Sequence, residues 1–350
     1  METSNKIEQG TTTTKRIEYI DALRGFTMFL VVAHHISNLC FNVIGHGFRS
    51  VSLYMLQIRM PLFFFISGFV LYKAGVVWDL KQIRSFFKKK IPVQLISPFI
   101  FFVTFVYVAD KDLIESIFDD GKVGYWFTFV LFEFYILYAF VRFLIRRDWA
   151  DFVLLFMGVV LFAIRWPFLK SYLPIPEYIL SFLCFDHWYL FLFFVIGTLT
   201  RKYFEKVEKL LDTQWLITMC VLFYFLANAF RLGNVFSEII VYPLLSLTGL
   251  TIVFSFFRSN KAAFSNEKRL GRIMQYTGRH TLDIYLIHFF LIPYNLTIVT
   301  IFKDHPMPVL EFTASAIIAI IIIAACLLVS NIIRLSPFLA HWLFGAKKEH

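Results

Sequence analysis

The chain has 350 residues, of which 59% are hydrophobic and 17% charged, with a net charge of +10. Soluble proteins carry about 25% charged residues, so this composition excludes a soluble globular protein and indicates a polytopic helical membrane protein. The basic excess does not indicate a nucleic-acid partner. The cations cluster between long apolar runs, where they favour contact with anionic membrane lipids.

The fold class predicted from the apolar runs is all-α, with about ten transmembrane helices and no separate soluble domain. We expect residues 1–15 to be a disordered cytoplasmic tail, residues 16–335 to form the membrane domain, and residues 336–350 to be a cytoplasmic C-terminal tail. No cleavable signal peptide is expected, because the first apolar run is too long. The predicted spans cover residues 20–40, 51–72, 91–109, 124–141, 150–168, 178–200, 213–230, 236–257, 280–302 and 310–333.

The lysines and arginines are distributed unevenly over the predicted loops. With a cytoplasmic N-terminus, 25 of the 34 lie in inner loops and tails, seven lie in outer loops, and Arg24 and Arg59 lie within spans. Cytoplasmic loops of membrane proteins carry an excess of these residues. The distribution therefore predicts that both the N-terminus and the C-terminus are cytoplasmic.

The first predicted span carries Arg24, His34 and His35. Ionisable groups at membrane depth are costly and usually face the bundle interior, where they serve a function. Arg24 and His35 are eleven residues apart, which is roughly three turns and about 16 Å along one helix face. We therefore predict a cation and an imidazole at two depths on one side of this helix. The alternatives are an arginine that snorkels to the interface and a hydrogen-bonded core histidine.

Other ionisable residues lie within or beside the spans, and each has a structural alternative. Arg59 is predicted to bind substrate or to seal the second span against carbonyl groups. Glu133 in the fourth span is predicted to be the counter-ion of Arg59 or a second acid–base group. His187, beside Asp186 at the outer mouth, is a candidate contact for an acceptor. His288 in the ninth span is predicted to bind substrate or to form an interhelical hydrogen bond.

The remaining polar and small residues favour structural interpretations. The four cysteines lie singly in apolar runs and are interpreted as packing residues rather than disulfides or metal ligands. No metal-ligand spacing is present, and the neighbours His34 and His35 point to different helix faces, so we expect no metal. Ser67–Gly68 is interpreted as a close helix-packing pair.

Five segments resemble, in order, the membrane-bound acyltransferase family 3. The first helix of that family carries an arginine and a histidine separated by ten residues, and Arg24 and His35 fit that spacing. The resemblance spans most of the chain. The matching segments are RIEYIDALRGFTMFLVVAHH (16–35), MPLFFFISGFVLYK (60–73), GYWFTFVLFEFYIL (124–137), HWYLFLFFVIG (187–197) and TGRHTLDIYLIHFFLI (277–292).

The resemblance implies an inner-membrane enzyme that transfers an acyl group, most often acetyl, from cytoplasmic acyl-CoA to a hydroxyl of an envelope carbohydrate. Acetyl-CoA is then the cosubstrate. His35 suits the role of general base, or of a nucleophile that carries the acyl group first, and the sequence leaves both open. Arg24 would hold the CoA arm or its phosphates, and Glu133 remains the second catalytic candidate.

The chain departs from the family near the third helix, where many members carry an Arg-x-x-Arg motif. The region here reads IRSFFKKKIPVQLISPF (83–99). Lysine neutralises a phosphate as a point charge but lacks the bidentate fork of arginine. We expect this basic cluster to bind the CoA phosphates, with membrane orientation alone as the alternative. Its members are Arg84, Lys88, Lys89 and Lys90.

A transporter or flippase of envelope glycan precursors is the alternative function. Buried arginine, glutamate and histidine suit a permeation path equally well. Internal repeats would favour a transporter, and the sequence has no obvious repeat. The sequence does not identify the acceptor sugar, the hydroxyl position, the acyl chain or the oligomeric state.

Overall fold

The computed structural model describes residues 17–41, 51–165, 170–229, 240–294 and 307–345. All secondary structure in these ranges is helical, in agreement with the predicted all-α class. The elements are α1 (Glu18–Leu39), α3 (Val51–Leu71), α4 (Leu80–Ile91), η1 (Pro92–Ile96), α5 (Ser97–Val108), α6 (Leu113–Ile117), η2 (Lys122–Gly124), α7 (Trp126–Leu144), α8 (Ala150–Ile164), α10 (Glu177–Phe182), η3 (Phe185–Leu190), α11 (Phe191–Lys202), α12 (Phe204–Leu211), α13 (Gln214–Ala229), α14 (Tyr242–Ser259), α15 (Arg269–Arg279), α16 (Thr281–Leu291), α18 (Pro308–Ile333) and α19 (Pro337–Phe344).

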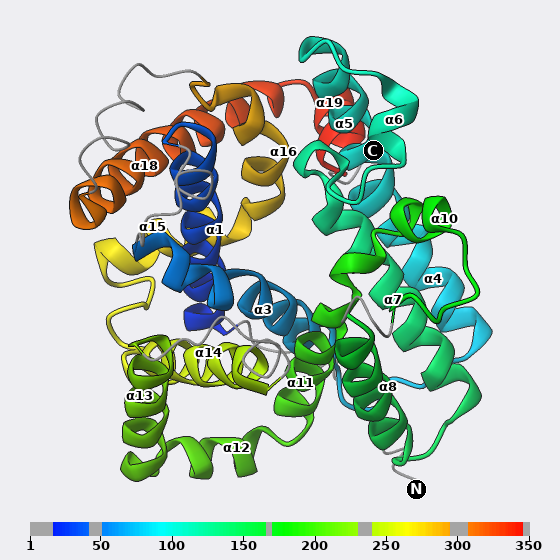
Figure 1. Ribbon diagram of the computed structural model, residues 1–350, viewed down its shortest axis with the longest axis vertical. Helices are drawn as coiled ribbons and strands as arrows, with labels where there is room; N and C mark the ends of the chain where they lie inside the picture. The colour runs from blue at the N-terminus through cyan, green and yellow to red at the C-terminus, as the bar shows by residue number, and fades with distance from the viewer. Residues whose placement is uncertain (1–16, 42–50, 166–169, 230–239, 295–306, 346–350) are drawn as a thin grey trace, which may run out of the picture.

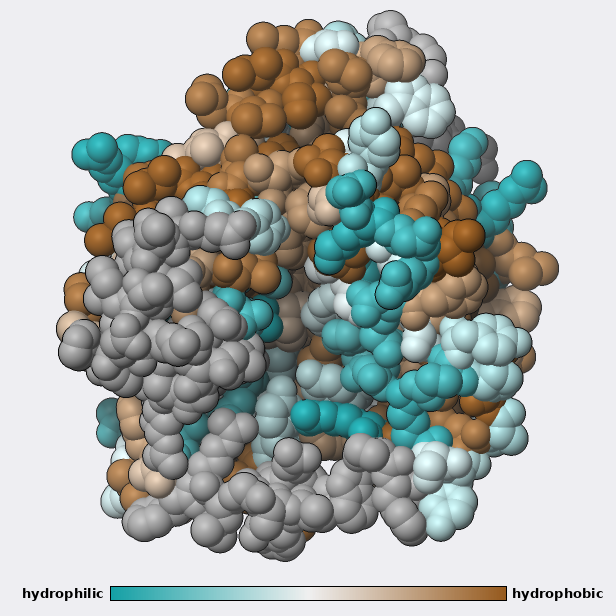
Figure 2. Space-filling view, turned by 45° about the horizontal axis from the view of Figure 1, so that its top comes forward, coloured by the Kyte–Doolittle hydropathy of each residue, from teal (hydrophilic) through white to brown (hydrophobic). Residues whose placement is uncertain are grey.

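Three described segments are long and apolar enough to cross a membrane: Leu80–Val108, α7 and α18. The pair α12 and α13 adds a fourth if it counts as one span bent by 74°. Figure 2 shows hydrophobic residues over the upper part of one face and hydrophilic residues gathered around a hollow at its centre. The chain is thus a helical membrane protein, whereas the predicted number of ten spans is not confirmed.

Residues 80–90, which the hydropathy pattern assigned to a loop, form helix α4 instead. The carboxylate of Asp79 accepts a hydrogen bond from the backbone N–H of Gln82 at 2.7 Å and caps the helix. Pro92 lies at the start of the π-helix η1, where its missing N–H is tolerated, and the chain continues into α5. The basic cluster is therefore fixed at helical spacing.

Two other predicted spans are broken or short. Span 178–200 is divided into α10, η3 and α11, and the break falls at Cys184, whose backbone is left-handed with φ of 49°. In span 280–302, α16 ends at Leu291, and residues 295–306 lie outside the described residues. Hydropathy does not reveal such a break, because a left-handed residue leaves the apolar composition unchanged.

Helices α3 and α11 pack side by side at the centre of the bundle (Figure 1). Their backbones touch: a Cβ added to Gly68 would lie 1.9 Å from the carbonyl oxygen of Phe194, and one added to Gly197 would lie 2.0 Å from that of Phe65. Glycine is required at both positions, so Gly68 does serve close helix packing. Helix α1 packs against α15, α16 and α18, while α8 packs against α11.

The expected C-terminal tail contains the ordered helix α19. Its N-terminus is capped by Ser336, and Phe344 near its end is buried and stacks with Phe101 of α5. The hydroxyl of Ser97 donates to the carbonyl of Trp342 at 3.2 Å. This part of the chain therefore belongs to the packed bundle. The tail predicted for residues 1–15 lies outside the described residues.

Candidate active site

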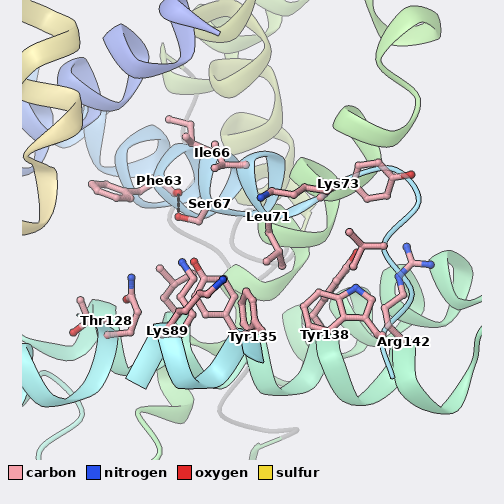
Figure 3. Close-up of a pocket in the computed structure, with 18 of the residues that line it drawn as sticks. Phe63, Ile66, Ser67, Leu71, Lys73, Lys89, Thr128, Tyr135, Tyr138 and Arg142 are labelled. Atoms are coloured by element: carbon pink, nitrogen blue, oxygen red, sulfur yellow. Dashed lines mark hydrogen bonds between the residues drawn. The ribbon is translucent and has the colours of Figure 1, made fainter. Parts of the chain in front are cut away.

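A cavity of about 590 Å³ lies where α3, α4 and α7 approach one another. Figure 3 shows Ser67 and Leu71 of α3 opposite Lys89 of α4 and Tyr135 and Tyr138 of α7. Aromatic and aliphatic side chains form much of its wall. Its charged lining residues are the cations Arg24, Lys73, Lys89, Lys90, Arg142 and Lys202 and the carboxylate Asp148.

Helix α4 turns one face toward this cavity. Gln82, Ser85, Phe86 and Lys89 line it at intervals of three and four residues, which places them on one side of a helix. Lys90 follows on the same face, and its Nζ lies 4.8 Å from the ring centroid of Tyr135, a cation–π contact. Lys90 is therefore held over aromatic rings at the cavity wall.

The structure divides the predicted basic cluster in two. Lys89 and Lys90 line the cavity, whereas Arg84 and Lys88 do not and lie on the opposite side of α4. A helix turns 100° per residue, so four cations within seven residues do not share one face. The geometry therefore leaves Lys89 and Lys90 as the members of the cluster that can meet a ligand in this cavity.

We call the part of the cavity that is lined by Arg142, Asp148 and Lys202 its mouth. The two cations there are held by carboxylates. Arg142 of α7 forms an ion pair with Asp151 of α8, and Lys202 of α11 donates to Asp151 at 2.7 Å and to Asp148 at 2.6 Å. The hydrogen bond from Lys202 lowers the pKa of the exposed Asp148 carboxyl below its usual value. The network joins the ends of three helices and partly neutralises two of the cations.

Arg24 reaches the cavity from α1. Its Nη2 donates a hydrogen bond to the hydroxyl of Thr281 at the start of α16, at 3.2 Å. Tyr285, one turn further along α16, also lines the cavity. Arg24 therefore lies where α1 and α16 meet the cavity wall, and Thr281 fixes the direction of its guanidinium.

His35 lies farther along α1 and does not line the cavity. Its ring centroid is 5.3 Å from that of His288 and 4.9 Å from that of Phe289, both on α16. Nδ1 of His288 lies 3.0 and 2.8 Å from the carbonyl oxygens of Ile284 and Tyr285, so this nitrogen carries the proton. In the neutral form of this tautomer Nε2 is an acceptor, and it is buried with no hydrogen-bond partner among the described residues.

Arg24 and His35 thus both face α16. Along α1 they are separated by about 16 Å of helical rise, and their partners Thr281 and His288 follow in the same order along α16. Although His34 is also near His35, no group of three or more His, Cys, Asp or Glu side chains in the described part of the chain has the arrangement of a metal site.

Comparison with known families decides the class of protein. A family model described as an acyltransferase domain, that of acyltransferase family 3, matches residues 17–330. The chain belongs to acyltransferase family 3. The match includes both the Arg24–Thr281 contact and the His35–His288 pair, and it makes the chain a membrane acyltransferase. Neither a curated protein nor a solved structure matches the chain.

In this acyltransferase, Glu133 does not lie beside His35. It is on the side of α7 that faces away from the cavity and accepts a hydrogen bond from Nε1 of Trp188 at 2.8 Å. The electrostatic neighbours of His35 include His288 and Arg59 but not Glu133. The structure therefore gives Glu133 a partner in η3 and places it apart from the Arg24–His35 side of the acyltransferase.

Like His288, the other two predicted substrate contacts, His187 and Arg59, lie outside the cavity. His187 of η3 stacks on Trp126 at the start of α7, with ring centroids 3.7 Å apart. Arg59 lies on α3, 12 residues before Leu71, and is within electrostatic range of His35. Arg59 is thus near the middle of α3, and neither residue is part of the cavity lining.

Several lining residues of the acyltransferase cavity were not predicted. Arg142 and Lys202 follow apolar runs, where cytoplasmic cations are common, so the sequence presents them only as orientation signals. Thr281 and Tyr285 lie within the matching segment 277–292, but nothing in one sequence shows which way they point. The available signal was that Tyr285 and His288 are three residues apart in an apolar run, which predicts that they lie on the same side of a helix.

Proposed function

We propose that this chain transfers an acyl group, acetyl in the simplest case, from acyl-CoA to a hydroxyl of an envelope carbohydrate. The main support is the cavity that combines lysines, an oriented arginine and apolar walls. CoA needs cations for its phosphates and an apolar channel for its arm. Lys89 and Lys90 suit the phosphates, and Arg24 suits the polar groups of the arm.

We place the mouth of the cavity on the cytoplasmic side of the cell inner membrane. The positive-inside distribution of lysine and arginine supports a ten-span topology with both termini cytoplasmic. Acyl-CoA then enters through the mouth, and its thioester extends past Tyr285 toward His35. The acceptor reaches His35 from the other side.

The reaction exchanges one acyl bond for another. The acceptor hydroxyl attacks the thioester carbon while His35 accepts the hydroxyl proton, the C–S bond breaks, and CoA leaves as a thiolate that takes up a proton. In the second route, the imidazole attacks first and the resulting acyl-histidine passes the group to the hydroxyl. Both routes place bond exchange at His35 and donor binding at Arg24.

The decisive experiment follows the acyl group. Purified protein in detergent receives acetyl-CoA labelled in the acetyl group, together with an extract of envelope glycans. We expect label in the glycan fraction and stoichiometric release of free CoA, and neither with His35→Ala. A wild-type protein that binds CoA yet transfers no acetyl, propionyl or succinyl group to any glycan would overturn the proposal.

A further inference from the structure

A second cationic cluster lies outside the lining of the cavity and contains an arginine with no carboxylate neighbour in the described part of the chain. Nε of Arg59 on α3 is buried and has no hydrogen-bond partner among the described residues. Its electrostatic neighbours in the described chain are Tyr189 and Tyr242, and its charge also reaches His34 and His35. A buried charge without a partner is costly, so such an arginine is usually kept for a ligand.

The same two tyrosines meet a second arginine. The guanidinium of Arg165 lies 4.5 Å from the ring centroid of Tyr189 and 4.3 Å from that of Tyr242. The two rings are 6.3 Å apart. Two guanidinium groups and two phenol hydroxyls, all able to donate hydrogen bonds, are therefore collected from four separate elements: α3, η3, α14 and the end of α8.

In this cluster, Arg165 lies at the end of α8 that is remote from the cavity, and Arg59 lies near the middle of α3. Arg59 precedes Phe63, the nearest cavity-lining residue of α3, by one helical turn, and it precedes Leu71 by 12 residues, which is about 18 Å of helix. Arg165 ends the helix whose beginning carries Asp151, the partner of Lys202. A ligand in the cluster would therefore approach His35 from the side opposite to the donor.

We propose that Arg59, Arg165 and the Tyr189–Tyr242 pair bind an anionic group of the acceptor, so that the acceptor is an acidic carbohydrate. This inference rests on the proposed acyl transfer and adds the charge of the acceptor to it. Guanidinium groups bind the oxygens of carboxylates and phosphates in bidentate geometry, and tyrosine hydroxyls donate to the same oxygens. The anion would fix the sugar while one of its hydroxyls reaches His35.

Direct binding to detergent-purified protein tests the inference without requiring catalysis. The probes are methyl β-D-glucuronide, which carries a carboxylate, glucose 6-phosphate, which carries a phosphate, and the neutral methyl β-D-glucoside. Affinities are measured by isothermal titration calorimetry for wild type, Arg59→Gln, Arg59→Lys and Arg165→Gln. Lys111→Gln is the matched control, because it removes one exposed cation from the loop after α5, outside the cluster.

We expect at least one anionic probe to bind about tenfold or more tightly than the glucoside, and the stronger probe identifies carboxylate or phosphate as the group. Arg59→Gln and Arg165→Gln should each remove most of this preference. Arg59→Lys should retain part of it, and Lys111→Gln should retain all of it. A variant that does not elute as a single species is set aside, and Arg165→Gln, which alters an exposed side chain, then decides.

Equal binding of charged and neutral sugars to the wild type would overturn the inference. A preference unchanged in both arginine variants would do the same. Neither result concerns the donor, so acyl transfer from acetyl-CoA, assayed separately, shows whether the proposed function itself holds.

Discussion

Two regions of the bundle hold cations in different surroundings. At the mouth of the cavity, Arg142 and Lys202 share Asp151, and three helix ends are tied together by these pairs. Near the middle of α3, Arg59 has tyrosine and histidine neighbours, with no carboxylate among those described. A cation paired with a carboxylate holds helices in place, whereas a buried cation without one is available to a ligand. Whether a cation has a carboxylate partner is therefore a better guide to its function than the number of cations in a region.

His35→Ala gives the largest expected effect and separates chemistry from binding. Loss of the base or nucleophile should lower acyl transfer by at least about a hundredfold. The affinity for CoA, measured by calorimetry, should stay near that of wild type because His35 does not line the cavity. His341→Ala on α19 is a matched control. Transfer above about a tenth of wild type would exclude His35 from both roles.

Arg24→Lys tests the residue at which α1, α16 and the cavity meet. Lysine keeps the charge but loses the planar fork that contacts Thr281 and that we propose to contact the donor. We expect a loss of about 2 kcal/mol, which is roughly thirtyfold in kcat/KM for acyl-CoA. The exposed Arg279→Lys serves as control. Near-normal kinetics would mean that any positive charge suffices at this position.

Two double variants each remove two positive charges from α4, but from different faces of the helix. Lys89→Gln/Lys90→Gln alters the cavity, and Arg84→Gln/Lys88→Gln alters the side of α4 that faces away from it. The first should weaken CoA binding roughly tenfold and flatten its dependence on salt, because exposed ion pairs are worth up to about 1 kcal/mol each and are screened by salt. The second should leave both unchanged. The same loss in both variants would assign these cations to membrane orientation or to a general surface potential.

Asp148→Asn gives the smallest expected effect and probes the balance of charge at the mouth. Removing this carboxylate leaves Lys202 with Asp151 as its remaining carboxylate partner, so the mouth becomes more positive and CoA should bind more tightly, by at most about threefold, with no difference at high salt. Because Lys202 lowers the pKa of Asp148, the pair contributes stability above the usual pKa of aspartate. That contribution is lost as the pH falls through the lowered value. Weaker CoA binding in this variant would contradict the charge-balance argument.

Much of the architecture was accessible from the sequence, and much of the site was not. Apolar runs predicted the helical class, and the eleven-residue step from Arg24 to His35 placed both on the side of α1 that meets α16. The partners Thr281 and His288 lie more than 250 residues away in sequence, so no local pattern indicates them. The division of the α4 lysines also escaped prediction, because the region was expected to be a loop and not a helix with two faces.

The backbone contact at Gly68 and Gly197 has a mechanical consequence. α3 carries Ser67 at the cavity and Arg59 two turns earlier, while α11 carries Lys202 at the cavity and directly follows η3 with its Tyr189. Backbones in contact leave no room for one helix to slip or roll against the other. The two helices therefore behave as one rigid unit. This unit fixes the distance between the cavity and the Arg59 cluster, so a residue inserted into or deleted from α3 would move the two proposed binding sites apart or out of alignment.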